Sequence, residues 1–192
     1  MKKLVTTIGL FLLINTCLIS QVSIDYRPKA LTNELMKMSK CDKIEMQELS
    51  LPDRQAVTSR MGKFFALPES CVVLGVKYVY VGRVNTCRAG GCVMPTNNSE
   101  QANEFFDYYI LYMTNATILK VKIFNYQSMH GQEVTATSWL KQFKNYDGSH
   151  ALVVGKNTDA ISGATISVDA ITSDIEDKTK FLLKILNGLL VK

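Results

Sequence analysis

The sequence predicts an α+β fold, in which a mostly antiparallel sheet is packed by helices and a long helix ends the chain. Three observations favour this fold. Runs rich in β-branched and aromatic residues follow one another between residues 64 and 126, as short strands do. The last two runs, 105–113 and 117–126, are separated by a short turn and indicate a hairpin. After residue 165, apolar residues recur at helical spacing.

Length and composition are typical of one globular domain with a leader. The chain has 192 residues, of which 47% are hydrophobic and 20% are charged. A net charge of +5 is too mild to favour nucleic-acid binding. We expect a signal peptide or N-terminal anchor at 1–22, a helical and edge extension at 23–62, and the main domain at 63–192.

The N-terminus has the pattern of an export signal. Lys2 and Lys3 precede an apolar run at 4–19, which is short for a membrane span. An uncleaved anchor and lipid attachment at Cys17 stay open as alternatives. We therefore expect an exported protein, in the periplasm or on the outer face of a bacterial membrane, with membrane association left open.

The extension carries no pattern that indicates a function. Residues 30–41 place their apolar side chains near one helical face, with Thr32 as the predicted N-cap. Residues 44–51 alternate in part and predict an edge strand, and 53–62 predict a short helix. We expect this extension to cover one edge of the sheet.

The predicted sheet starts at Phe64 and comprises the strands 64–67, 71–75, 77–84, 105–113 and 117–126. A short helix is predicted at 137–143, with Trp139, Leu140 and Phe143 on one face. The apolar run 152–154 predicts a short buried strand. The final helix should pack on the sheet.

Cys41, Cys71, Cys87 and Cys92 form an even set that permits two disulfides in an oxidising compartment. The glycines between Cys87 and Cys92 allow these two to close a small loop, and Cys41 with Cys71 would then be the other pair. A redox-active dithiol stays open, although Cys-x-x-Cys is the usual redox spacing.

The stretch Asp159-Ala160-Ile161-Ser162-Gly163-Ala164-Thr165 directly precedes the final helix. Its small residues let a bulky group approach the backbone closely. The hydroxyl of Thr165 stands where the helix begins, and a helix N-terminus offers unpaired N–H groups and a positive dipole end. The stretch therefore predicts a phosphate-bearing group held at, or bonded to, Thr165; a polar loop that caps a helix is the alternative.

The pattern Asp-x-x-Ser-Gly-Ala-Thr resembles the flavinylation motif of FMN-binding domains, such as the FMN-carrying subunits of sodium-pumping quinone reductases and of Rnf-type complexes. The resemblance implies that a flavin transferase moves FMN from FAD onto Thr165 as a phosphoester. It also implies that Ser162, Gly163 and Ala164 shape the turn and that Asp159 serves the transferase reaction. It extends loosely over residues 64–145.

The loop that contains His130 and Gly131 has a counterpart in the same family, where a His-containing loop lies near the flavin. The resemblance implies that these two residues contact the cofactor. The Glu-Thr-Pro-Gly that often follows in the family is replaced here by the residues 132–135, and a simple loop hydrogen bond stays open for His130. Trp139 is expected in the core, with flavin stacking as the alternative.

The resemblance implies an extracytoplasmic flavoprotein that carries covalent FMN and relays electrons between donor and acceptor proteins of the envelope, alone or as a subunit of a redox complex. No catalytic triad and no metal-binding motif is evident. Three alternatives stay open: a reductase that binds FMN without a covalent bond, a cofactor-free envelope binding module, and a thiol–disulfide exchanger that uses Cys87 and Cys92.

Overall fold

The computed structural model describes residues 23–39, 41, 43–50, 61–69, 75–86 and 104–188. The elements in chain order are α1 (Lys29–Met38), β1 (Gln47–Glu48), β2 (Gly62–Ala66), β3 (Val76–Asn85), β4 (Phe105–Met113), β5 (Ile118–Tyr126), η1 (Gln132–Thr135), α3 (Thr137–Leu140), η2 (Lys141–Phe143) and α4 (Thr165–Leu186). The predicted export signal, the Cys87–Cys92 loop and most of the elements predicted at 53–62 and 71–75 lie outside the described residues.

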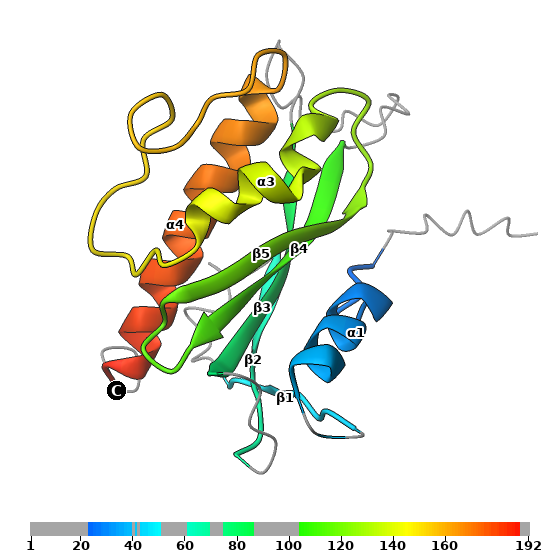
Figure 1. Ribbon diagram of the computed structural model, residues 1–192, viewed down its shortest axis with the longest axis vertical. Helices are drawn as coiled ribbons and strands as arrows, with labels where there is room; N and C mark the ends of the chain where they lie inside the picture. Colours follow the sequence, from blue (N-terminus) through cyan, green and yellow to red (C-terminus); the bar gives the residue numbers. More distant parts are fainter. Residues whose placement is uncertain are drawn as a thin grey trace, which may run out of the picture.

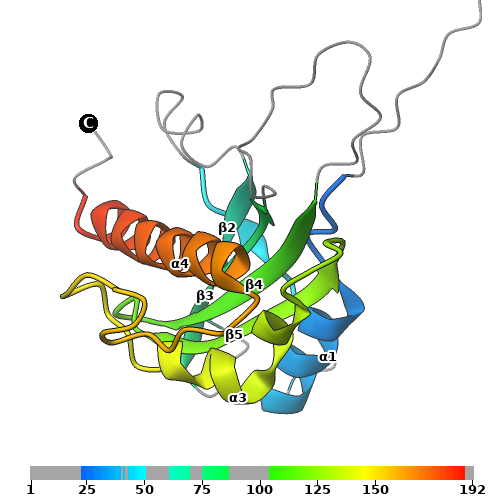
Figure 2. The ribbon, with the colours of Figure 1, turned by 90° about the horizontal axis from the view of Figure 1, so that it is seen from above.

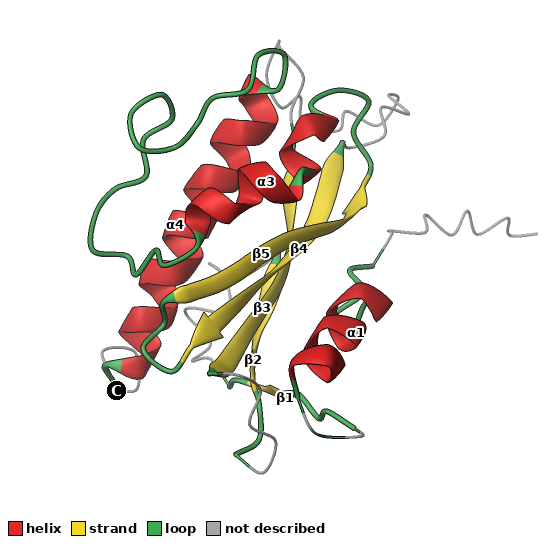
Figure 3. Ribbon diagram, in the orientation of Figure 1, coloured by secondary structure: helices red, strands yellow, loops and turns green. Residues whose placement is uncertain are grey.

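The five strands form one antiparallel sheet in the order β1-β2-β3-β4-β5, so that each strand pairs with its neighbour along the chain. Tyr80 of β3 lies opposite Ile110 of β4, which in turn lies opposite Val121 of β5. This sheet and the helix α4 that packs on it confirm the predicted fold class (Figure 3).

Helices cover both faces of this sheet (Figures 1 and 2). Alternate residues of β4 take part in two separate cores, because successive side chains of a strand point to opposite faces. Tyr108 and Ile110 belong to the core shared with α4, whereas Tyr109 and Leu111 belong to the core shared with α1. As a result, β4 is buried without a break from Phe106 to Tyr112.

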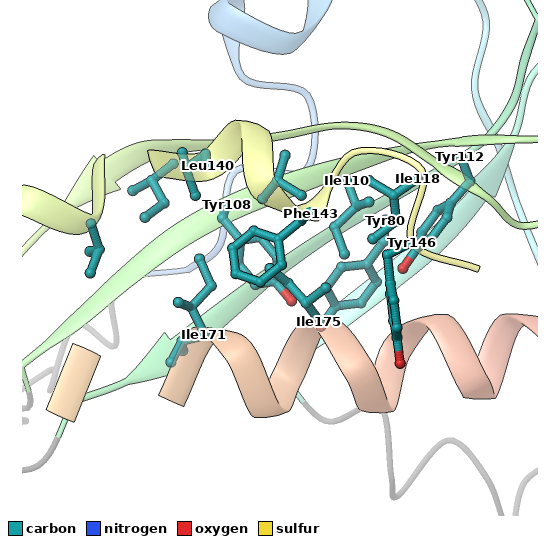
Figure 4. Close-up of a cluster of buried hydrophobic side chains, with 14 of the residues drawn as sticks. Tyr80, Tyr108, Ile110, Tyr112, Ile118, Leu140, Phe143, Tyr146, Ile171 and Ile175 are labelled. Carbon is teal, nitrogen blue, oxygen red and sulfur yellow. The ribbon is translucent and has the colours of Figure 1, made fainter. Parts of the chain in front are cut away.

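Helix α4 packs on the sheet through an apolar stripe at helical spacing, as its sequence predicts. Val168, Ile171, Ile175 and Leu182 have no exposed surface. Figure 4 shows Ile171 and Ile175 meeting side chains of β3 and β4. None of the helices in the described part of the chain is long and apolar enough to cross a membrane.

The structure departs from the predictions in the N-terminal extension. Helix α1 is N-capped by Pro28, and the hydroxyl of Thr32 lies inside the helix, 3.3 Å from the carbonyl oxygen of Pro28. The helix covers a face of the sheet rather than an edge, because Leu31 and Leu35 are buried against the strands. Within the described part of the extension, β1 lies at an edge of the sheet, as expected.

The prediction of a short buried strand at 152–154 is wrong. The side chain of Asn157 accepts a hydrogen bond from the N–H of Val153 and donates one to the carbonyl oxygen of Ala151. These bonds close a turn in which the only strand-like pairing is the isolated bridge between Val154 and Thr158. Val153 is 43% exposed. An Asn side chain that satisfies nearby backbone groups competes with a sheet ladder for them.

Candidate functional site

The stretch Asp159–Thr165 forms a turn on the surface that leads directly into α4. The N–H of Ala164 donates to the carbonyl oxygen of Ile161 at 3.1 Å, and Gly163 has φ +82°. A positive φ at this place of a turn favours glycine. Ala164 is buried at 2% exposure, whereas Asp159, Ser162 and Thr165 are exposed. The turn is thus anchored by Ala164 and presents its polar residues to solvent.

Helix α4 begins at Thr165 and has no side-chain cap among the described residues. Ala164 occupies the N-cap position and offers no hydrogen-bond acceptor beyond its backbone, and the first turn contains no acidic residue. The first N–H groups of a helix lack partners within the helix, and the dipole of 22 aligned residues leaves a partial positive charge there. The exposed Thr165 hydroxyl therefore stands at a place that stabilises negative charge.

Asp159 is held by its backbone and presents its carboxylate to solvent. The indole N–H of Trp139 donates to the carbonyl oxygen of Asp159 at 2.9 Å, and the N–H of Asp159 donates to Oε1 of Gln142 at 2.7 Å. Trp139 is half-buried and meets Phe143 edge-on at 5.3 Å between ring centroids. The α3–η2 segment therefore fixes where the predicted motif starts.

The loop of His130 and Gly131 lies against the first turn of α4, at Ser167, two residues beyond Thr165. The hydroxyl of Tyr126 donates to the carbonyl oxygen of His130 at 2.6 Å and lies 3.2 Å from Oγ of Ser167. Gly131 has φ +81°, and a Cβ added there would lie 2.7 Å from Oγ of Ser167. Only glycine fits between this loop and the helix.

His130 itself contributes its backbone to this arrangement. Its carbonyl oxygen accepts the hydrogen bond from Tyr126, and its side chain is exposed. The loop is further tied to the sheet, because the ring of Tyr126 stacks on that of Phe106 at 5.5 Å. The hydrogen bond that was the alternative for His130 is thus present at its backbone, while a contact of its ring with a cofactor stays a prediction.

A partly buried polar cluster lies further along α4, where the side chain of Asp174 is 22% exposed and that of Lys178 is 10% exposed. The hydroxyl of Tyr108 donates to Oδ2 of Asp174 at 2.5 Å, and Nζ of Lys178 lies 3.3 Å from Oδ1 of the same carboxyl. Burial raises the pKa of Asp174, although Lys178 and Tyr108 act in the opposite direction. Burial also raises the pKa of Tyr108, with the charge of Asp174 as the next cause, so its phenol stays protonated.

Sequence reasoning placed the strand 117–126, which ends at Tyr126, near the expected flavin, but it missed two residues that position the site, Gln142 and Ser167. The position of Ser167 could have been noticed in the sequence. It directly precedes Val168 of the apolar stripe, so a polar side chain is expected there near the buried face of the helix. A polar residue near such a face needs a partner, and here the partner is Tyr126. Gln142 carries no comparable signal.

Cys41 is disulfide-bonded. The other cysteines lie outside the described residues, so its predicted pairing with Cys71 stays a prediction. In the part of the chain that the structure describes, no group of three or more His, Cys, Asp or Glu residues is arranged to hold a metal ion.

No family model matches the sequence, and no curated protein matches it either. The residues around Thr165 and the resemblance of their motif are therefore what supports a function for this chain.

Proposed function

We propose that this chain is an extracytoplasmic flavoprotein that carries FMN through a phosphoester at Thr165 and relays electrons between envelope partners. The observation that supports the proposal best is the exposed hydroxyl of Thr165 at the first position of a long helix without a side-chain cap. A phosphoester there meets the free N–H groups of the first turn.

The residues present fit the proposed group. Attachment joins Oγ of Thr165 to the FMN phosphorus of FAD, breaks the bond from that phosphorus to the AMP phosphate, and releases AMP with the hydroxyl proton. The exposed turn gives a transferase access to Thr165, and the carboxylate of Asp159 faces solvent where a transferase can reach it.

Bound FMN supplies one- and two-electron chemistry at its ring. The chain supplies position. The Gly163 turn sets the direction from which Thr165 is reached, and the N-terminus of α4 stabilises the negative charge of the phosphoester. The loop of His130 and Gly131, which packs on Ser167, is a close neighbour of the first turn.

Intact-protein mass spectrometry tests the proposal. The full chain is produced in a host with an extracytoplasmic flavin transferase, together with Thr165→Ala and Thr165→Ser. We expect a mass gain of one FMN less one water in the parent protein and none in Thr165→Ala. Thr165→Ser keeps the hydroxyl and serves as the matched control for acceptance by the transferase.

The other outcomes separate the alternatives. No gain in the parent, while a known acceptor is modified in the same cells, rejects the covalent bond. A yellow protein without the gain then indicates reversible FMN binding, as in a reductase of a small acceptor. A colourless protein indicates a cofactor-free binding module.

A further inference from the structure

Two side chains of the α3–η2 segment bind the backbone of Asp159. The indole N–H of Trp139 donates to the carbonyl oxygen of Asp159 at 2.9 Å, and Oε1 of Gln142 accepts the N–H of Asp159 at 2.7 Å. Trp139 and Gln142 are three positions apart, so they lie on one face of this helical segment. A single short element therefore holds both polar backbone groups of Asp159, while its carboxylate stays exposed.

The chain is also attached to the fold on either side of this contact. Thr158, directly before Asp159, is 3% exposed, and its carbonyl oxygen accepts the N–H of Gly155 at 2.8 Å. At the other end of the stretch, Ala164 is 2% exposed and directly precedes Thr165. The stretch from Asp159 to Thr165 is thus anchored at both ends, and the two polar groups that it presents to solvent stand on anchored backbone.

We propose that Trp139 and Gln142 are positioning residues for the attachment of FMN, because they hold Asp159 in the place where a flavin transferase recognises it. This role rests on the proposed function, in which Oγ of Thr165 joins the FMN phosphorus of FAD and AMP leaves with the hydroxyl proton. A transferase that binds the stretch in one shape binds it more tightly when the free protein already has that shape. The recognised feature then includes a side chain 20 residues earlier in the chain.

The stability of the fold gains little from Gln142. Its Nε2 is buried and has no hydrogen-bond partner among the described residues, and a buried donor left unpaired lowers stability. Asp159 is exposed, so water can replace Oε1 at its N–H. Gln142→Met keeps the length of the side chain and removes both polar groups, and it should leave the free energy of unfolding nearly unchanged. A loss of FMN transfer in this variant would therefore not follow from a loss of stability.

The test measures FMN transfer to the full chain by a purified flavin transferase with FAD, followed by intact-protein mass spectrometry at several acceptor concentrations. Gln142→Met and Trp139→Phe should each lower kcat/KM for the acceptor about two- to tenfold, mainly through a higher KM, because each removes one hydrogen bond that holds Asp159. Gln142→Glu keeps an oxygen acceptor at the same reach and should restore most of the parent's value. Ser138→Ala, at an exposed position of the same helix, should change neither constant.

A second readout follows the backbone of Asp159 without the transferase. Its amide hydrogen should exchange faster in Gln142→Met than in the parent, because the acceptor is lost. Val79→Ala is the control for overall stability. It removes buried volume from the core shared with α1, on the other face of the sheet, so it should lower the free energy of unfolding and keep the parent's kcat/KM.

The outcomes separate this role from the proposed function. A parent protein that stays unmodified, while a known acceptor is modified in the same assay, rejects the phosphoester and the positioning role together. A modified parent, with Gln142→Met and Trp139→Phe at the parent's kcat/KM, rejects the positioning role alone. That role is also overturned if Val79→Ala lowers kcat/KM as much as Gln142→Met, since the effect would then be one of overall stability.

Discussion

Gly131 and Ser167 show how closely two distant parts of the chain approach one another. The glycine belongs to the loop after β5, and the serine belongs to the first turn of α4. Their contact lies close to Thr165, the proposed site of the phosphoester. The motif around Thr165 was predictable as a set of residues, since their small size and the following helix are local features. The contact between Gly131 and Ser167 was not predictable, because the local sequence around each residue does not indicate which distant residue it will contact.

Replacing Gly131 with alanine should destabilise the protein by about 1–3 kcal/mol, which a urea unfolding curve measures. The positive φ of +81° strains any other residue, and the new Cβ would press on Oγ of Ser167. Gly155→Ala is the matched control. Gly155 has φ +80° with nothing within 4 Å of an added Cβ. Gly155→Ala should therefore lower the free energy of unfolding only by the cost of the strained backbone conformation.

The double variant Gly131→Ala with Ser167→Ala separates the contact from the backbone strain. It should recover part of the stability lost in the single glycine variant, because the clashing hydroxyl is gone. Equal losses for Gly131→Ala and Gly155→Ala would contradict the close packing of this loop on α4.

At the scale of an element, α4 combines an N-terminus without a side-chain cap with a partly buried acid, Asp174, about two turns beyond it. The helical period was readable from the sequence, and so was its start at Thr165. The environment of Asp174 could not be predicted from the sequence, because the spacing of an acidic residue along a helix does not show whether its side chain faces solvent or the sheet. The register of β4 decides the matter by placing Tyr108 beneath the helix.

The carboxyl of Asp174 should make folding less favourable as the pH rises. Burial raises its pKa in the folded protein above the ordinary 3.8, so the folded state binds more protons than the unfolded state between these two values. Its contribution to the free energy of unfolding therefore falls across that window. Asp174→Asn removes this slope, and its stability relative to the parent should rise with pH in unfolding curves taken from pH 3 upward.

Glu176→Gln is the control with the opposite sign. The hydrogen bond from Lys180 lowers the pKa of Glu176 below the ordinary 4.5, and the stability it contributes is lost as the pH falls through the lowered value. This variant should therefore lose stability relative to the parent as the pH rises. A difference between Asp174→Asn and the parent that stays constant with pH would show that Asp174 is not desolvated.

At the scale of the whole molecule, α1 makes the N-terminal extension a layer of the fold that packs on one face of the sheet. Its residues Leu31 and Leu35 bury the face of β3 and β4 that α4 leaves open, together with Val79 and Tyr109. The unbroken burial of β4 follows from this arrangement, because a strand covered on both faces has no solvent side. Without α1, an apolar sheet face would be exposed.

Leu35→Ala should destabilise the whole fold by about 2–5 kcal/mol, because Leu35 is 1% exposed within the α1 core. Met36→Ala, one residue further along the same helix, should change the free energy of unfolding by less than about 0.5 kcal/mol, since Met36 is 43% exposed. Both are measured by urea unfolding with circular dichroism. If the two variants unfolded at the same urea concentration, α1 would not be part of the cooperative unit.

The sequence by itself determined the fold class, the hairpin of β4 and β5, and a turn of small residues before α4. These features follow from local periodicity and from the backbone freedom of small residues, which a chain carries wherever it folds. Only the tertiary structure decided that α1 covers a face, that the 152–154 run is a turn, and that Gly131 packs on Ser167. Each of these depends on a partner distant in sequence or on an alternative hydrogen bond, and the periodicity of a segment does not encode what it will meet.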